Sequence, residues 1–219
     1  MNILIVGNLG SQAEFKSKFG GKHSCLFKNY LELERKEVLS AEVIFDFQIV
    51  EHPDHGTIYL ENSDALLVLN SVKTTLVKLK KMYGWKNNLV GFNGLPGMFD
   101  KPMLELTIAG SSKKLVENLC LQMSTDYRIV EDKIGMVTPR VVSMIINEAY
   151  YTVEEGTATI EDINVAMKLG TNYPAGPFEM ANSIGITHIY ELLKALSGST
   201  GDERYKICSL LKKHSYSQK

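Results

Sequence analysis

The fold is decided by the first twelve residues, which read MNILIVGNLGSQ. Residues 2–6 form a short apolar run rich in β-branched side chains, and Gly7 ends it, which predicts a buried strand. Apolar residues at helical spacing over residues 11–19 predict a helix directly after it. A strand, a glycine turn and a helix make up the opening unit of a nucleotide-binding sheet.

Strand and helix patterns keep alternating for the first two-thirds of the chain. Helices are predicted at 72–82 and 111–123, and strands at 24–27, 43–50, 64–69, 88–92, 103–108 and 127–130. This alternation predicts an α/β fold of the Rossmann-like kind, with a mostly parallel sheet covered by helices.

The pattern changes after Lys133, where strand signals stop and only helical spacing remains. Thr159 followed by Asp162 resembles a capping box at the start of one of these helices. We therefore expect two domains, a truncated Rossmann-like domain at 1–133 and a small all-helical domain at 134–219.

Composition limits the function classes. The chain has 219 residues, 44% hydrophobic and 22% charged, with a net charge of −1, so no global field attracts nucleic acid or a membrane surface. No apolar stretch reaches the ~18 residues of a membrane helix. Cys25, Cys120 and Cys208 are far apart, which argues against a disulfide framework or a metal cluster and favours a cytoplasmic location.

The turn after the first strand departs from the GxGxxG fingerprint of dinucleotide sites. Gly7 is in register, but Leu9 and Gln12 occupy the other two glycine positions. We expect Leu9 to crowd the phosphate approach and Gln12 to push the helix from the strand. Gly7, Leu9 and Gly10 are the candidate phosphate-binding residues.

The second strand ends in Lys28 and Asn29, where an acidic residue usually binds the adenosine ribose. Lys28 is therefore a further cofactor-binding candidate, and its charge suits the 2′-phosphate of NADP. Two interpretations stay open from these residues: an altered nucleotide site, or a Rossmann-like scaffold whose site has decayed.

Histidines come close together only in the stretch EHPDH at residues 51–55. This stretch could hold a metal ion or supply a catalytic base. A solvated loop after a strand is the favoured interpretation, and we expect no metal site.

The helical third carries the motifs of a known family. Residues 135–140 (GMVTPR), 160–170 (IEDINVAMKLG) and above all 172–179 (NYPAGPFE) resemble the C-terminal domain of 3-hydroxyacyl-CoA dehydrogenases. In the first part, Leu69-Asn70-Ser71 and Phe92-Asn93 followed by Glu105 are similar to further segments of that family.

The resemblance implies a Rossmann domain for NAD and a helical domain that completes the active site and usually forms a homodimer. It implies oxidation of the 3-hydroxyl group of an acyl-CoA, a step of fatty acid metabolism. In this family a histidine takes the proton, a glutamate orients the histidine, and hydride passes to the nicotinamide.

Residue by residue, the resemblance implies that Glu105 is the orienting glutamate and that Ser71 lies near the substrate oxygen. Asn70 matches a residue near the nicotinamide. Alignment of Phe92-Asn93 on the family's FFN motif puts Val90 at the catalytic histidine and Pro139 at the substrate-binding asparagine. The sequence therefore predicts either an NAD-dependent 3-hydroxyacyl-CoA dehydrogenase, or a degenerate relative that binds acyl-CoA, a nucleotide or a partner without turnover.

Overall fold

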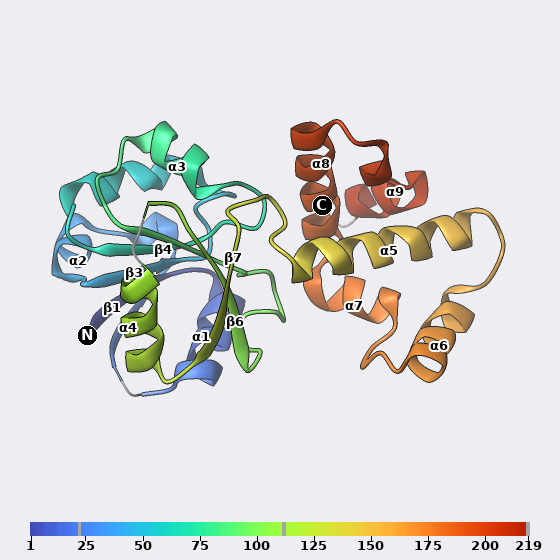
Figure 1. Ribbon diagram of the computed structural model, residues 1–219, viewed down its shortest axis with the longest axis horizontal. Coiled ribbons are helices and arrows are strands. Elements are labelled where there is room, and N and C mark those ends of the chain that lie inside the picture. Colours follow the sequence, from blue (N-terminus) through green and yellow to red (C-terminus); the bar gives the residue numbers. More distant parts are fainter. Residues whose placement is uncertain (22, 111–112, 218–219) are drawn as a thin grey trace. The chain divides into compact units, whose positions relative to one another are not determined.

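The computed structural model describes residues 1–21, 23–110 and 113–217 (Figure 1). It divides the chain into two compact units, Met1–Met136 and Val137–Lys219. The division lies three residues beyond the expected end of the first domain at Lys133. We call these parts the sheet unit and the helical unit.

The sheet unit is built on one seven-stranded sheet with the order β2-β1-β3-β4-β5-β6-β7. All neighbouring strands are parallel except β5 and β6, which are antiparallel. The mostly parallel α/β fold expected from the sequence is confirmed. The strands are β1 (Asn2–Val6), β2 (Ser24–Lys28), β3 (Val43–Asp46), β4 (Leu66–Asn70), β5 (Leu89–Phe92), β6 (Met103–Ile108) and β7 (Asp126–Val130).

Helices cover both faces of this sheet, as Figure 1 shows. On one face α1 (Leu9–Phe19) and α4 (Lys113–Met123) bury their apolar sides. On the other face lie α2 (Arg35–Ser40), the 3-10 helix η2 (Pro53–Glu61) and α3 (Leu76–Tyr83). The first two residues of the helix expected at 111–123 lie outside the described residues.

Strand β3 ends four residues earlier than the pattern predicts, at Asp46 instead of residue 50. The Asp46 carboxylate accepts a hydrogen bond from the backbone N–H of Gln48 at 2.7 Å, which turns the chain out of the strand. Between β2 and β3 the chain forms the 3-10 turn η1 (Tyr30–Glu32) and α2, with no further strand among the described residues 29–42. Strand β2 lies at the edge of the sheet, where it pairs with β1.

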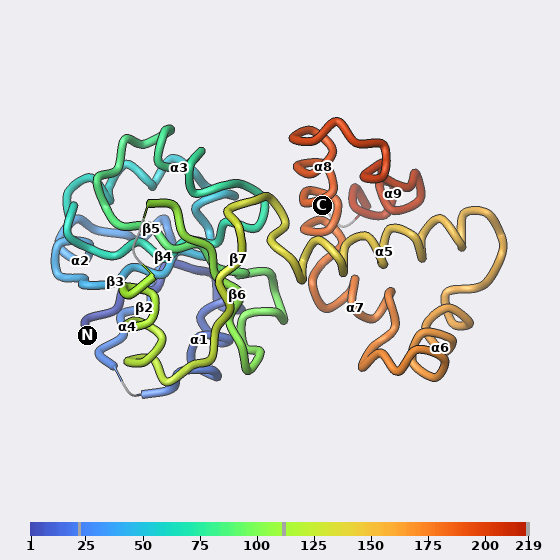
Figure 2. The backbone as a smooth tube through the Cα atoms, viewed as in Figure 1, coloured from blue at the N-terminus to red at the C-terminus, as the bar shows by residue number. Residues whose placement is uncertain are grey.

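The helical unit contains α5 (Thr138–Glu154), α6 (Ile160–Thr171), α7 (Pro177–Ile184), α8 (Ile186–Thr200), the 3-10 turn η3 (Glu203–Tyr205) and α9 (Ser209–Ser217), as the tube in Figure 2 traces. The capping box expected at Thr159 and Asp162 is present at the start of α6. Within the described residues, no helix combines the length and apolar character that a membrane span requires.

Candidate functional site

If Glu105 is the orienting glutamate, the catalytic histidine of the family is expected opposite it. In the structure the residue opposite Glu105 is Asn93. Strands β5 and β6 are antiparallel with Phe92 opposite Leu106. The backbone N–H of Asn93 donates to the carbonyl oxygen of Glu105 at 3.2 Å, so these two residues are also opposite each other. Opposing residues share a sheet face, so Asn93 and Glu105 lie on the same side of the sheet. The Asn93 amide itself donates to Met98 Sδ at 3.4 Å and accepts from the backbone N–H of Leu95 at 3.4 Å.

Val90 is not opposite Glu105, so the structure does not support the alignment that puts Val90 at the catalytic histidine. Val90 is opposite Ile108, is fully buried, and packs in the core with α1 and α4. Side chains alternate between faces along a strand, so Val90 and Glu105 belong to opposite faces. The residue opposite Glu105 is Asn93, three residues further along the chain than the position that the sequence alignment predicts.

The side chain of Asn70 forms hydrogen bonds within the fold. It lies at the carboxyl end of β4 and is buried. Its amide nitrogen donates to the carbonyl oxygen of Phe47 at 3.2 Å, and its amide oxygen accepts from the backbone N–H of Gly94 at 3.2 Å. The side chain therefore ties the chain after β3 to the chain after β5.

Ser71 is almost completely buried, and its hydroxyl has no hydrogen-bond partner among the described residues. It is packed against β5, where a Cβ atom at Gly91 would lie 2.2 Å from Ser71 Oγ and 3.0 Å from Thr107 Oγ1. Gly91 thus provides the space for Ser71. The hydroxyl is enclosed by the sheet, so a role near the substrate oxygen stays a prediction.

The turn between β1 and α1 is organised by its own side chains. Asn8 caps α1, its side-chain oxygen accepting from the backbone N–H of Ser11 at 3.0 Å. The amide of Gln12 folds back and donates to the carbonyl oxygen of Gly7 at 2.8 Å. Gln12 is therefore accommodated by the turn. Leu9 remains 85% exposed at the position where a glycine would let backbone approach a pyrophosphate.

Lys28 is at the end of β2, and its ammonium group forms an ion pair with Glu37 Oε1 at 2.7 Å. Glu37 lies on α2 and is buried. The hydrogen bond with Glu37 raises the pKa of Lys28. The carboxylate neutralises the charge that a 2′-phosphate would need, which disfavours NADP at this position.

The histidine loop at residues 51–55 differs from the solvated loop expected. The His55 side chain is only 7% exposed, and its Nε2 lies 2.7 Å from Asp46 Oδ2. The hydroxyl of Tyr59 donates to the same oxygen at 2.7 Å. Asp46 itself is fully buried, so its charge is balanced inside the fold by these partners.

This buried cluster shifts the titration of its members. Burial by itself lowers the pKa of His55, but the hydrogen bond with Asp46 and the charge of the carboxylate outweigh burial, so the pKa lies above its ordinary 6.5. Burial, followed by the charge of Asp46 and the hydrogen bond to it, raises the pKa of Tyr59 well above its ordinary value. The imidazole is thus held in its charged form to higher pH.

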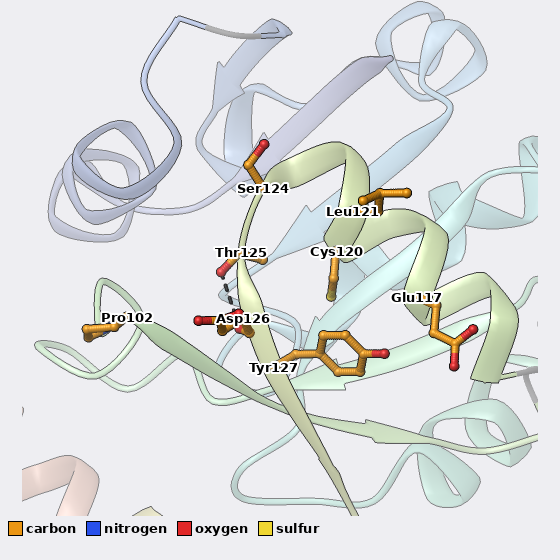
Figure 3. Close-up of a pocket in the computed structure, with 8 residues that line it drawn as sticks. All are labelled: Pro102, Glu117, Cys120, Leu121, Ser124, Thr125, Asp126 and Tyr127. Atoms are coloured by element: carbon orange, nitrogen blue, oxygen red, sulfur yellow. Dashed lines mark hydrogen bonds between the residues drawn. The ribbon is translucent and has the colours of Figure 1, made fainter.

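A surface depression lies away from these residues, at the ends of α4 and β7. Figure 3 shows its lining, which consists of Pro102, Glu117, Cys120, Leu121, Ser124, Thr125, Asp126 and Tyr127. Burial raises the pKa of the Cys120 thiol to about 11, so at neutral pH this group is a protonated thiol and a poor nucleophile. We assign no chemistry to this depression.

In the helical unit, the segment at residues 172–179 forms packing contacts and hydrogen bonds within the fold. The backbone N–H of Phe178 donates to Asn164 Oδ1 at 3.1 Å, and a Cβ atom at Gly176 would lie 2.1 Å from that oxygen. Glu179 Oε2 accepts from the backbone N–H of Gly176 at 2.8 Å and closes the start of α7. Pro139 is buried in the first turn of α5 and offers no side-chain hydrogen bond.

Parts of this sequence are similar to known proteins. Residues 135–219 match the family model described as 3-hydroxyacyl-CoA dehydrogenase, C-terminal domain. The chain is 41% identical over 102 residues to 3-hydroxyadipyl-CoA dehydrogenase of Escherichia coli, covering 47% of this chain and 21% of that protein. It is 34% identical over 134 residues to 3-hydroxybutyryl-CoA dehydrogenase of Bradyrhizobium diazoefficiens, covering 56% and 44%.

Residues 135–219 therefore carry the C-terminal domain of the 3-hydroxyacyl-CoA dehydrogenase family. The alignments of the chain span less than half the length of the curated relatives that it matches first. The fold agrees with the crystal structure of (S)-3-hydroxybutyryl-CoA dehydrogenase from Ralstonia eutropha, with a TM-score of 0.77 and 18% identity over 99% of this chain and 93% of that one. Members of this 3-hydroxyacyl-CoA dehydrogenase fold combine a Rossmann sheet with a helical domain.

Proposed function

We propose that the whole chain is a member of the 3-hydroxyacyl-CoA dehydrogenase family that binds 3-oxygenated acyl-CoA thioesters without the histidine-dependent turnover of a dehydrogenase. One observation carries the proposal: the side chain opposite Glu105 is the amide of Asn93. An amide neither takes up nor releases a proton near neutral pH, whereas a positioned general base contributes ~10²–10⁴ in rate.

Family membership supports acyl-CoA as the ligand class, since the relatives are named for 3-hydroxyadipyl-CoA and 3-hydroxybutyryl-CoA. The same relationship implies a place in fatty acid metabolism, a cytoplasmic location and a homodimer formed through the helical unit. These finer points are part of the proposal. Sedimentation of the purified chain over a range of concentrations tests the homodimer.

The test compares binding with turnover. Calorimetric titration with acetoacetyl-CoA and with butyryl-CoA, which lacks the 3-oxygen, measures recognition of that oxygen. We expect acetoacetyl-CoA to bind about 3- to 10-fold more tightly, because one hydrogen bond contributes about 0.5–1.5 kcal/mol. Asn93→Ala should remove the preference, because in this proposal the Asn93 amide is the group that donates a hydrogen bond to the 3-oxygen.

Turnover is measured as NADH formed from 3-hydroxybutyryl-CoA, and none is expected from the folded wild-type chain. NADH formation that rises in proportion to protein concentration would overturn the loss of catalysis. Failure of acetoacetyl-CoA to bind at all would overturn the ligand class.

A further inference from the structure

A Rossmann sheet binds its dinucleotide in a crevice at one place, where the strand order reverses. Here the chain runs from β1 to β2 on one side and then crosses to β3 on the other side of β1. The crevice is therefore expected over the carboxyl end of β1, between the chain that follows β2 and the chain that follows β3.

Two aromatic rings of the chain itself bridge this place. Tyr30 follows β2 and His52 follows β3, and their rings stack with centroids 3.9 Å apart and planes 11° from parallel. Rings at this separation are in van der Waals contact, so no third ring fits between them. Because β1 lies between β2 and β3, the stack links the two sides of the expected crevice across the end of β1.

The stack rests on a buried anchor. The backbone N–H of His52 donates to the carbonyl oxygen of Gln48 at 2.9 Å, and His55 pairs with the fully buried Asp46 at 2.7 Å. The ring of Tyr30 also lies 5.7 Å from that of His55. Displacing the stack would disturb a buried charge pair, which is costly for the fold.

The turn between β1 and α1 also packs against the chain that follows β3. Phe47, the first residue after β3, is buried and lies against the turn, since a Cβ atom at Gly7 would be 3.6 Å from Phe47 Cβ. Its ring packs 4.9 Å from that of Phe99. Glu14 on α1 accepts hydrogen bonds from the backbone N–H groups of Gly97 at 2.9 Å and of Phe99 at 3.3 Å, which fixes this loop to α1.

The polar groups that a dinucleotide would use are also engaged. Asn8 takes the backbone N–H of Ser11 that a phosphate oxygen would otherwise accept, and Leu9 replaces the glycine of close approach. At the ribose position, Lys28 and Glu37 are paired with each other. The residues present therefore do not fit NAD.

We infer that the Tyr30–His52 stack, seated on the Asp46–His55 pair, closes the dinucleotide crevice of this chain, so that the sheet unit takes neither NAD nor NADP. The inference goes beyond the proposed function, because it concerns the cofactor crevice and not the thioester. It assigns the closure to two rings that can be removed.

The experiment titrates the full chain with NADH and with ADP, following NADH fluorescence and the heat of binding. We expect no saturable binding of NADH or ADP to the wild-type chain at concentrations up to about 1 mM. The double variant Tyr30→Ala with His52→Ala should bind ADP at least about 10-fold more tightly than the wild type, a gain of about 1.4 kcal/mol.

Tyr127→Ala is the matched control, because it removes a ring from β7 at the far edge of the sheet and should leave ADP binding unchanged. Emission from Trp85, the one tryptophan of the chain, verifies that each variant is folded. Saturable NADH binding by the wild type that ADP competes away would overturn the inference. A folded double variant as inert as the wild type would overturn the role of the stack.

These outcomes separate the crevice from the proposed function. If neither acetoacetyl-CoA nor NADH binds, the proposed acyl-CoA ligand class is overturned, whereas the inference that the crevice is closed still stands. If both NADH and acetoacetyl-CoA bind, the inference that the crevice is closed is overturned, whereas the proposed acyl-CoA ligand class still stands.

Discussion

The helical unit and the sheet unit of this chain differ in which features of the family they contain. In the helical unit the family's most specific segment is intact as packing: Gly176 makes room for Asn164, whose oxygen caps the backbone of Phe178. In the sheet unit the strands follow a doubly wound order with β2 at the edge, and the candidate ligand-binding positions hold Leu9 and Asn93. Packing requirements and chemical requirements are thus separable within one fold.

The physical reason lies in what each kind of residue does for stability. A residue that only contacts a ligand can be replaced without loss of folding, provided that the new side chain is paired or packed. Asp46 and His55 form such a buried pair at the end of β3. The following predictions test this contrast.

The largest effect is expected at Asp46. Asp46→Ala leaves the imidazole of His55 and the hydroxyl of Tyr59 buried without their acceptor, and should lower the free energy of unfolding by about 3–5 kcal/mol. Urea unfolding followed by Trp85 fluorescence measures it in the sheet unit. Asp54→Ala, at an exposed position nearby, is the control. A loss no larger than that of the control would contradict a stabilising role for the cluster.

A histidine placed at Val90 on β5, or at Asn93 directly after β5, distinguishes the core from the candidate site. Val90→His puts a polar ring into the core and should cost about 2–3 kcal/mol of unfolding free energy, whereas Asn93→His should cost less than about 1 kcal/mol. Proton NMR of Asn93→His should give a pKa above 6.5 for the new imidazole, because Glu105 favours its charged form. With Glu105→Gln added, the pKa should fall; an unchanged pKa would refute the pairing.

A smaller effect is expected from pH. The pKa of His55 is raised above 6.5 in the folded chain, so the stability that its pairing with Asp46 contributes is fully present below 6.5. It is lost as the pH rises through the folded pKa. Urea unfolding of the wild type and of His55→Asn at a series of pH values isolates this contribution. Parallel pH profiles for the two proteins would exclude it.

The smallest effect is expected in the helical unit, at the start of α6. Thr159→Ala removes the oxygen that caps the backbone N–H of Asp162 at 3.1 Å, and should cost about 1 kcal/mol of unfolding free energy. Circular dichroism of the helical signal during urea unfolding measures it, with the exposed Thr157→Ala as control. Equal losses in the two variants would show that the capping box contributes nothing here.

The sequence by itself determined what depends on neighbours along the chain. The strand, glycine turn and helix of residues 1–19, the alternation up to β7 and the capping box of α6 are local patterns, set by side-chain period and by turn residues. The extent of β3 was overestimated, because the apolar run to residue 50 continues beyond the turn that the Asp46 side chain imposes.

Only the tertiary structure decided which distant residues meet. Asn93 lies opposite Glu105 because of the antiparallel register between β5 and β6, and a register is a property of two strands together. His55 reaches Asp46, and Tyr30 reaches His52, because the sheet order brings segments after β2 and β3 to the same edge. Pairings across a sheet depend on backbone geometry that the local pattern of either segment does not specify.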